Sequence, residues 1–230
     1  MDGIRDSLGL LVPAYVLHLP GEGKKYIGGY LRRLKEIENG QPPEDVTILT
    51  TATKDTIDSC PLIYQLNKSG IPFVNSAKDY EGEWKKTDKL PLILNALSTI
   101  DTKYTLLLDA NDVVMLKSID QDFITIFNKF NCDILFNGSQ YLYPKIISAM
   151  IEKEHESPFI NHYLNAGVCF GYTDKIKHIY DTAYYHSQHK HYAPFESEQY
   201  YVRIGIIENE KDVKVKIDDA SHLFLCSHGN

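Results

Sequence analysis

Two carboxylates three residues apart carry the clearest chemical signal in the chain. Asp109 directly follows the apolar run at 104–108, and Asp112 comes three residues later. In open α/β sheets, ligands bind beyond the carboxyl ends of the strands. Two carboxylates at such a place form an oxygen-rich site suited to Mg²⁺ or Mn²⁺, which would also hold substrate phosphates. Taken alone, the segment is more typical of a simple turn, where Asp and Asn make local hydrogen bonds.

The elements that must position this pair alternate between strands and helices. Strands are expected at 14–19, 46–52, 71–75, 104–108, 133–137, 164–172 and 213–218. Helices are expected at 21–40, 55–69, 87–100, 120–130, 145–155, 174–189 and 196–205. This order predicts an α/β fold with a largely parallel sheet. We find no internal repeat and no clear linker, so residues 1–230 are predicted to form a single domain.

The charge balance limits the classes of partner. The 230 residues include 24 Lys and Arg against 31 Asp and Glu, which gives a net charge of −7. A nucleic-acid binder usually carries a basic surface, so none is expected as a partner. An acidic protein can still bind phosphates where a metal ion supplies the positive charge locally.

The cysteines and the apolar segments bear on the compartment. Cys60, Cys132, Cys169 and Cys226 are far apart and form no CxxC pair, which argues against a disulfide scaffold and a structural zinc site. Such cysteines favour a reducing compartment, and we expect a cytoplasmic protein. No stretch of 18 uninterrupted apolar residues occurs, so no membrane span is predicted.

Five short segments of the chain are informative together: VTILTTATKDT at 46–56, YTLLLDANDVVML at 104–116, YLNAGVCFGYTDKI at 163–176, ESEQYYVRI at 196–204 and CSHGN at 226–230. In the same order, they resemble segments of the glycosyltransferase domain of the lysyl hydroxylases that modify collagen. The resemblance implies a GT-A fold, which is a Rossmann-like mixed, largely parallel sheet with helices on both faces. It also implies a UDP-sugar donor, Mn²⁺ (or Mg²⁺) as cofactor, and a hydroxyl acceptor on a glycan, a polypeptide or a small molecule.

The resemblance implies a set of metal ligands. Asp109 and Asp112 take the positions of the family's two ligating aspartates, and His228 takes that of the histidine in its His-Gly-Asn segment. An imidazole added to two carboxylates favours Mn²⁺ somewhat over Mg²⁺. Gly229 follows His228 and would lie near the diphosphate. Asn111 stands where the family has an aromatic residue beside the nucleotide, so a stacking contact is not carried over.

The nucleotide is expected to contact the loop after the first family-like strand. There, backbone groups of Thr51, Ala52 and Thr53 and a hydroxyl could read the edge of the uracil. A simple strand-to-helix turn is an equally good interpretation of each of these residues singly. Lys89 takes the place of a family lysine near the nucleotide, and Lys85 and Lys86 lie within a few residues of the same register.

The resemblance also implies which residues lie beside the donor sugar and the acceptor; we call these the sugar-side residues. Asn165 and Gly167 belong to a segment whose small residues would allow close approach of the donor sugar. Glu196 and Glu198 stand where the family has acidic residues beside the acceptor, and Glu198 fits the register better. A carboxylate there would act as general base on an acceptor hydroxyl or stabilise positive charge at the anomeric carbon.

The acceptor is not transferred from the family. Ser139 and Tyr143 stand where family members carry an acidic residue and a Trp. Acceptor recognition is therefore expected to differ, and specificity for collagen is not carried over.

Three other interpretations stay open. A nucleotidyltransferase would share an acidic metal site, but the chain has no GxxxxGK[ST] phosphate loop. A non-catalytic or degenerate carbohydrate-binding module would suit the 16 tyrosines. In another register, 14–19 would be the first strand of the nucleotide-binding unit, and His18, Leu19 and Pro20 would bind the uridine.

Overall fold

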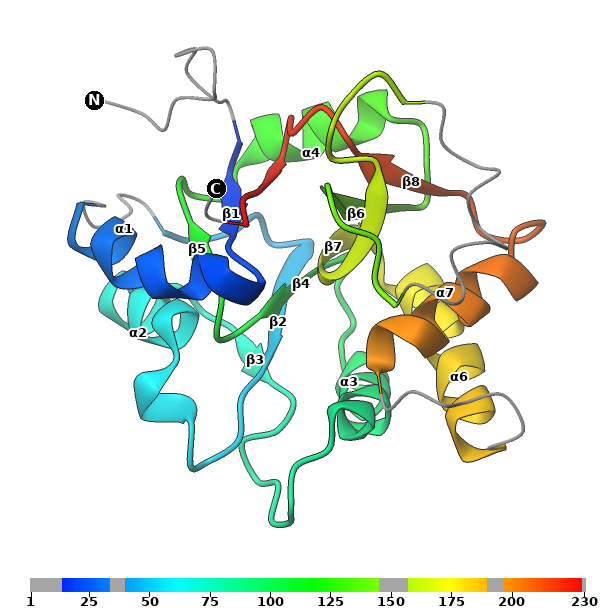
Figure 1. Cartoon of the computed structure of the whole chain (residues 1–230), viewed down its shortest axis with the longest axis horizontal. Coiled ribbons are helices and arrows are strands. Elements are labelled where there is room, and N and C mark those ends of the chain that lie inside the picture. The colour runs from blue at the N-terminus through cyan, green and yellow to red at the C-terminus, as the bar shows by residue number, and fades with distance from the viewer. Residues whose placement is uncertain (1–13, 34–39, 145–156, 190–196, 229–230) are drawn as a thin grey trace.

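The computed structural model describes residues 14–33, 40–144, 157–189 and 197–228 (Figure 1). The helix predicted at 145–155 and two of the predicted site residues, Glu196 and Gly229, lie outside the described residues.

Six strands form the main sheet. In spatial order they are β3 (Val74–Asn75), β2 (Val46–Thr51), β4 (Tyr104–Asp109), β7 (Tyr163–Tyr172), β6 (Ile134–Ser139) and β8 (Val215–Asp218). The pairs β2–β3, β2–β4 and β6–β8 are parallel, whereas β7 runs antiparallel to both of its neighbours. The sheet is therefore mixed and largely parallel, as predicted.

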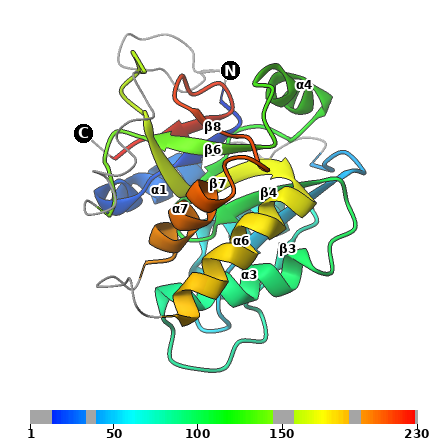
Figure 2. The ribbon, with the colours of Figure 1, turned by 90° about the vertical axis from the view of Figure 1, so that its right-hand side faces the viewer.

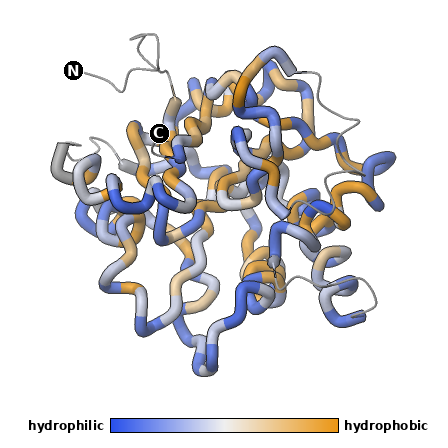
Figure 3. The backbone as a smooth tube through the Cα atoms, viewed as in Figure 1, coloured by the Kyte–Doolittle hydropathy of each residue, from blue (hydrophilic) through white to orange (hydrophobic). Residues whose placement is uncertain are grey.

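Helices cover both faces of this sheet. One face carries α3 (Lys89–Leu97), α6 (Thr173–Gln188) and α7 (Glu198–Glu208), which lie together in Figure 2. The other face carries α2 (Pro61–Lys68) and α4 (Gln121–Lys129). In α3 the buried residues Leu90, Ile93 and Leu97 recur at the spacing that places side chains on one helical stripe. Figure 3 shows this pattern as hydrophobic colour along the packed elements and hydrophilic colour in the loops between them.

A second, three-stranded sheet packs against the face that carries α2 and α4. It consists of β5 (Val113–Met115), β1 (Val16–His18) and β9 (Phe224–Cys226), with β1 antiparallel to β5 and parallel to β9. The sequence did not mark β5 as a strand, because three apolar residues after a turn carry too little pattern. This small sheet brings the start and the end of the described chain beside the turn that contains Asp112.

The helix expected at 55–69 begins later than predicted. Cys60 is extended at ψ 116°, as expected for a residue that precedes a proline, and Pro61 then opens α2. A short 3₁₀ turn at Ile57–Ser59 precedes it, and Gly70 ends the segment at φ +64°. The helix expected at 21–40 is described as a 3₁₀ segment, Gly21–Tyr26, followed by α1, Ile27–Arg33. In the parts of the chain that the structure describes, no helix is long and apolar enough to cross a membrane.

Candidate metal and nucleotide site

The acidic pair lies at the end of β4, as the sequence indicated. Asp109 is the last residue of β4, and Asp112 immediately precedes β5 and is only 6% exposed. Burial raises the pKa of the Asp112 carboxyl, but the nearby His18 imidazole and the Lys24 ammonium outweigh burial and lower the pKa to about 2. Lys24 Nζ lies 3.1 Å from Asp112 Oδ2. Asp112 is therefore ionised at any physiological pH and can bind a cation.

Lys89 joins the acidic pair to α7. Its ammonium forms ion pairs with Asp109 and with Glu198, the latter at 2.9 Å, and the side chains of Lys89 and Glu198 are each 14% exposed. Burial opposes the charge on Lys89, yet the two carboxylates raise the pKa of its ammonium well above the ordinary value. For the Asp109 carboxyl, burial is the largest effect and raises its pKa, whereas the nearby Lys89 ammonium acts to lower it. A row of alternating charges thus crosses the end of the sheet from α7 to β4.

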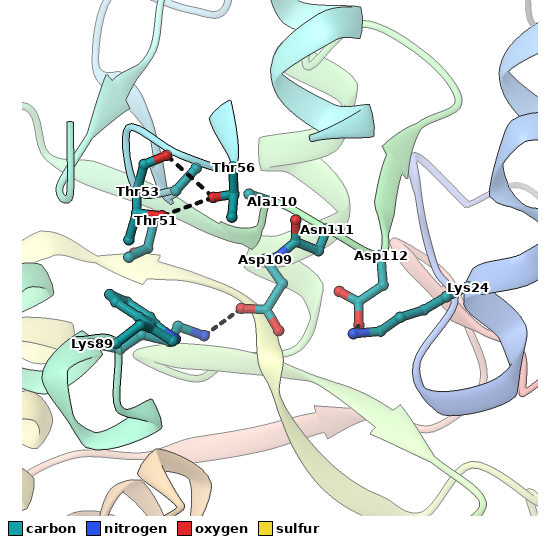
Figure 4. Close-up of a pocket in the computed structure, with 11 residues that line it drawn as sticks. Lys24, Thr51, Thr53, Thr56, Lys89, Asp109, Ala110, Asn111 and Asp112 are labelled. Carbon is teal, nitrogen blue, oxygen red and sulfur yellow. Dashed lines mark hydrogen bonds and ion pairs between the residues drawn. The ribbon is translucent and has the colours of Figure 1, made fainter. Parts of the chain in front are cut away.

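The acidic pair and the loop after β2 line one pocket (Figure 4). Its lining residues are Lys24, Thr51, Ala52, Thr53, Thr56, Trp84, Lys89, Asp109, Ala110, Asn111 and Asp112. Most of the residues that the resemblance assigned to the donor therefore line one pocket: Thr51, Ala52, Thr53, Lys89, Asp109 and Asn111. Asn165 and Gly167, which were assigned to it as well, do not line this pocket. Lys89 lines it, whereas Lys85 and Lys86 do not, and His18, Leu19 and Pro20 of the alternative register are also absent from the lining.

The loop after β2 is held in place by β3. The Ala52 N–H donates to Asn75 Oδ1 at 2.9 Å, and Asn75 Nδ2 donates back to the Ala52 carbonyl at 2.9 Å. Thr51 and Ser76 join their hydroxyls at 2.8 Å. Asn75 thus engages both backbone groups of Ala52, and contact of this loop with a base stays a prediction. Asn111 accepts a hydrogen bond from the Cys60 thiol at 3.0 Å.

Two of the predicted sugar-side residues, Asn165 and Gly167, lie near the start of β7. Asn165 Oδ1 accepts from the Gly167 N–H at 2.8 Å, and Gln199 Oε1 of α7 accepts from the Ala166 N–H at 3.1 Å. The β6–β7 register shifts between Phe136 and Asn137, so this stretch of β7 bulges. A Cβ on Gly167 would lie 2.8 Å from Asp109 Oδ2, which shows how closely the bulge approaches the acidic pair.

The histidine beside the acidic pair is His18 of β1. Ligand atoms of His18, Asp109 and Asp112 all lie within 4.8 Å of one another, which suits a metal ion. His228 lies outside this group, and its Nε2 is 2.9 Å from Ser139 Oγ. Burial and the nearby His18 lower the pKa of His228. That His228 ligates a metal stays a prediction.

The sequence comparison decides the family. Residues 44–230, well over half of the chain, match the family described as the PLOD GT domain. The chain belongs to the PLOD GT domain family. The resemblance drawn from the five segments is thereby confirmed, and with it the GT-A class of fold and the assignment to glycosyltransferases. Among curated proteins, none matches this chain in sequence.

Several solved structures are similar in fold to this PLOD GT domain. A glycosyltransferase involved in the glycosylation of the major capsid of PBCV-1 shares 17% identity at a TM-score of 0.46, over 76% of this chain and 82% of that one. The 4-diphosphocytidyl-2C-methyl-D-erythritol synthase from Anaerococcus prevotii shares 14% identity at a TM-score of 0.38, over 86% and 77% of the two chains. A197 from STIV shares 16% identity at a TM-score of 0.39, over 75% of this chain and 80% of that one.

Reasoning from sequence did not identify two residues that form ion pairs with Asp112. Lys24 reaches Asp112 from the 3₁₀ segment, and His18 reaches it from β1. Both precede residue 44, where the family match begins. The apolar AYVLHL segment, with its single histidine, was the one available signal, because a lone polar residue in a buried strand needs a partner.

Proposed function

We propose that this chain is a metal-dependent glycosyltransferase that moves a sugar from a UDP-sugar to a hydroxyl acceptor. The observation that carries the proposal is the carboxylate pair of Asp109, which is partly exposed, and Asp112, which is buried; both line one pocket with the loop after β2 of a PLOD GT domain. The alternating charge row from Asp109 through Lys89 to Glu198 supports it, because it extends from the metal pair towards the predicted sugar side.

The cation is proposed to be Mn²⁺ or Mg²⁺, held by Asp109 and Asp112. The residues fit such an ion, since Asp112 Oδ1 is buried without a hydrogen-bond partner. When bound, the ion would neutralise charge on the departing diphosphate. Lys24 is 52% exposed, so its ion pair with Asp112 is weak and easily exchanged for a stronger cation or for a phosphate.

The transfer is proposed to occur between Asn165 and Glu198. The acceptor oxygen would form a bond to the anomeric carbon while the bond from that carbon to the β-phosphate oxygen breaks. UDP leaves with the electron pair, and the proton of the acceptor hydroxyl passes to a base, for which Glu198 is our choice among the described carboxylates. Lys89, which lines the pocket, holds Glu198 beside it through an ion pair at 2.9 Å.

The test is a screen of UDP-sugars for UDP release in the presence of Mn²⁺. We expect release from at least one UDP-sugar by the wild-type protein and a strong loss in Asp112→Asn. Asp79→Asn is the matched control, since Asp79 is 87% exposed and outside the pocket.

Two results of this screen would contradict the proposal. Release of pyrophosphate from UTP or CTP with a sugar phosphate, without UDP release, would indicate a nucleotidyltransferase. Binding of UDP-sugars without turnover, in Asp112→Asn and wild type alike, would indicate a non-catalytic module.

A further inference from the structure

Two buried polar atoms, His18 Nε2 and Asp112 Oδ1, face each other as a long ion pair at 3.6 Å, beyond hydrogen-bond distance. His18 is 2% exposed, and its Nε2 has no hydrogen-bond partner. Asp112 Oδ1, 3.6 Å away, has none either. Buried polar atoms are normally satisfied, so this pair calls for an explanation.

The spacing of the ligand atoms at this place suits an ion. Oxygen ligands lie roughly 2.0–2.6 Å from a hard divalent cation, so two ligands on one ion are at most about 4–5 Å apart. The ligand atoms of His18, Asp109 and Asp112 meet this limit, all lying within 4.8 Å. Gly167 keeps the space open, since a Cβ there would lie 2.5 Å from His18 Cε1 and 2.9 Å from its Nε2.

We propose that His18 is a metal ligand through Nε2 and completes a His–Asp–Asp site with Asp109 and Asp112. The inference rests on the proposed function for the two carboxylates, and it adds a ligand from β1, which lies outside the family match at 44–230. An imidazole among the carboxylates makes Mn²⁺ a better occupant than Mg²⁺, because nitrogen is the softer ligand.

Asn137 of β6 acts as the positioning residue for His18. Its Nδ2 lies 3.1 Å from His18 Nδ1, and its Oδ1 is buried with no hydrogen-bond partner. The two ends of an amide are assigned only from their hydrogen bonds. With the amide reversed, Oδ1 accepts from Nδ1–H, and the lone pair of Nε2 faces the carboxylates. Metal-ligating histidines usually have such a partner on the other ring nitrogen.

His228, the histidine implied by the family resemblance, is engaged elsewhere. Its Nε2 lies 2.9 Å from Ser139 Oγ and 3.6 Å from Cys226 Sγ, and its ring packs edge-on against Tyr141. Metal binding by His18 and metal binding by His228 therefore predict opposite effects of the two substitutions, and one spectroscopic experiment can distinguish them.

Pulsed EPR of Mn²⁺ bound to the full chain provides the test, because a directly bound imidazole couples its ¹⁴N nucleus to the metal electrons. We expect this coupling in the wild type and in His228→Ala, and its loss in His18→Ala. Persistence of the coupling in His18→Ala would overturn the proposal, as would its loss in His228→Ala alone.

A second variant guards against misfolding of His18→Ala. His18→Gln keeps a side chain of similar reach that binds through oxygen, so it should hold Mn²⁺ without the imidazole coupling. Absence of the coupling in the wild type with Mn²⁺ bound would also overturn the proposal, with no variant needed. Because no donor is present, failure of UDP-sugar turnover leaves this experiment unaffected, and the two proposals fail separately.

Measuring Mn²⁺ affinity in variants of Asn137 tests its positioning role. Asn137→Leu should weaken binding roughly 10- to 100-fold, the usual effect of losing such a partner. Asn137→Asp keeps an acceptor against Nδ1 and should retain the affinity and the ¹⁴N coupling. Equal weakening in both variants would show that an acceptor against Nδ1 is not what matters and would overturn the positioning role of Asn137.

Discussion

At the scale of single residues, the site depends on charges that are buried together. Lys89 separates two carboxylates that would otherwise repel each other; Lys89 and Glu198 are largely buried, and Asp109 is partly buried. Removing one member of such a set costs more than the set contributes, because the remaining charges stay buried without compensation. Lys89 is therefore both a structural and an electrostatic component of the pocket.

Lys89→Met tests this dependence. We expect the free energy of unfolding to fall by about 2–4 kcal/mol, because Asp109 and Glu198 lose their shared cation. Adding Glu198→Gln should restore part of the loss. Chemical denaturation measures both, with Lys86→Met at an exposed position as the control. A loss no larger than that of the control would refute the account of Lys89.

Gly167→Ala tests the space for the ion. The added methyl group would press against His18 and Asp109 Oδ2. Mn²⁺ affinity should fall roughly tenfold or more, as it does when metal ligands are displaced. Gly29→Ala is the matched control, because a Cβ there meets nothing within 4 Å. Titration calorimetry with Mn²⁺ decides, and equal affinities in the two variants would argue against a site at this place.

At the scale of elements, β1 must be fixed for His18 to reach the acidic pair. Tyr15, just before β1, donates from its hydroxyl to Asp120 Oδ1 at 3.2 Å. The same oxygen accepts from the Phe123 N–H at 3.0 Å and so caps the start of α4. Strand and helix thus share one carboxylate.

This shared carboxylate predicts a loss of stability in alkaline solution. Burial and then the charge of Asp120 raise the pKa of Tyr15 from 10.0 to about 12. The unfolded chain loses the phenol proton first, so the stabilisation is present below pH 10 and disappears as the pH approaches 12.

Tyr15→Phe isolates this contribution. The wild type should be more stable than the variant by about 1–2 kcal/mol near pH 8, and the difference should shrink near pH 11. Urea denaturation at both pH values measures it, with Tyr64→Phe at an exposed position as the control. A difference that stays constant with pH would contradict the pKa assigned to Tyr15.

At the scale of the whole molecule, the two sheets are joined where β8 leads into β9. Asp218 is fully buried, and its carboxylate accepts three backbone N–H groups, from His222, Leu223 and Phe224. Burial raises the pKa of Asp218, and these three bonds offset the effect only in part. The turn they form aligns β9 with β1 and hence supports the position of His18.

Asp218→Ala should therefore weaken the whole domain. Three buried N–H groups would lose their acceptor, and we expect a loss of roughly 3 kcal/mol or more in the free energy of unfolding. Asp218→Asn, which keeps one acceptor oxygen, should lose less. Thermal and chemical denaturation measure both, and Asp219→Asn is the adjacent control. Equal stability of Asp218→Ala and the control would contradict this role.

The sequence predicted the main sheet and much of the pocket because both rest on local patterns. Buried strands such as 104–108 read as continuous apolar runs, and Asp109 follows directly from the end of one. The loop at 51–53 likewise follows β2 within a few residues. Local sequence order is sufficient to place such residues at one edge of a sheet.

The sequence could not predict which residues of the small sheet lie beside the acidic pair. His18 and Asp112 are 94 residues apart, and they meet only because β1 pairs with β5 and β9. Strands of three residues carry no periodicity that would reveal this pairing. The role of Lys24 was missed for the same reason, since a lysine in a polar segment is ordinarily solvated.

The central claim is that the pocket at the end of β4 binds the nucleotide diphosphate through a metal ion. Calorimetric titration of UDP with and without Mn²⁺ tests it most directly, on the wild type and Asp112→Ala. We predict binding to the wild type that requires Mn²⁺ and is lost in Asp112→Ala. Binding of UDP that is equally strong without Mn²⁺, or unchanged in Asp112→Ala, would contradict the account.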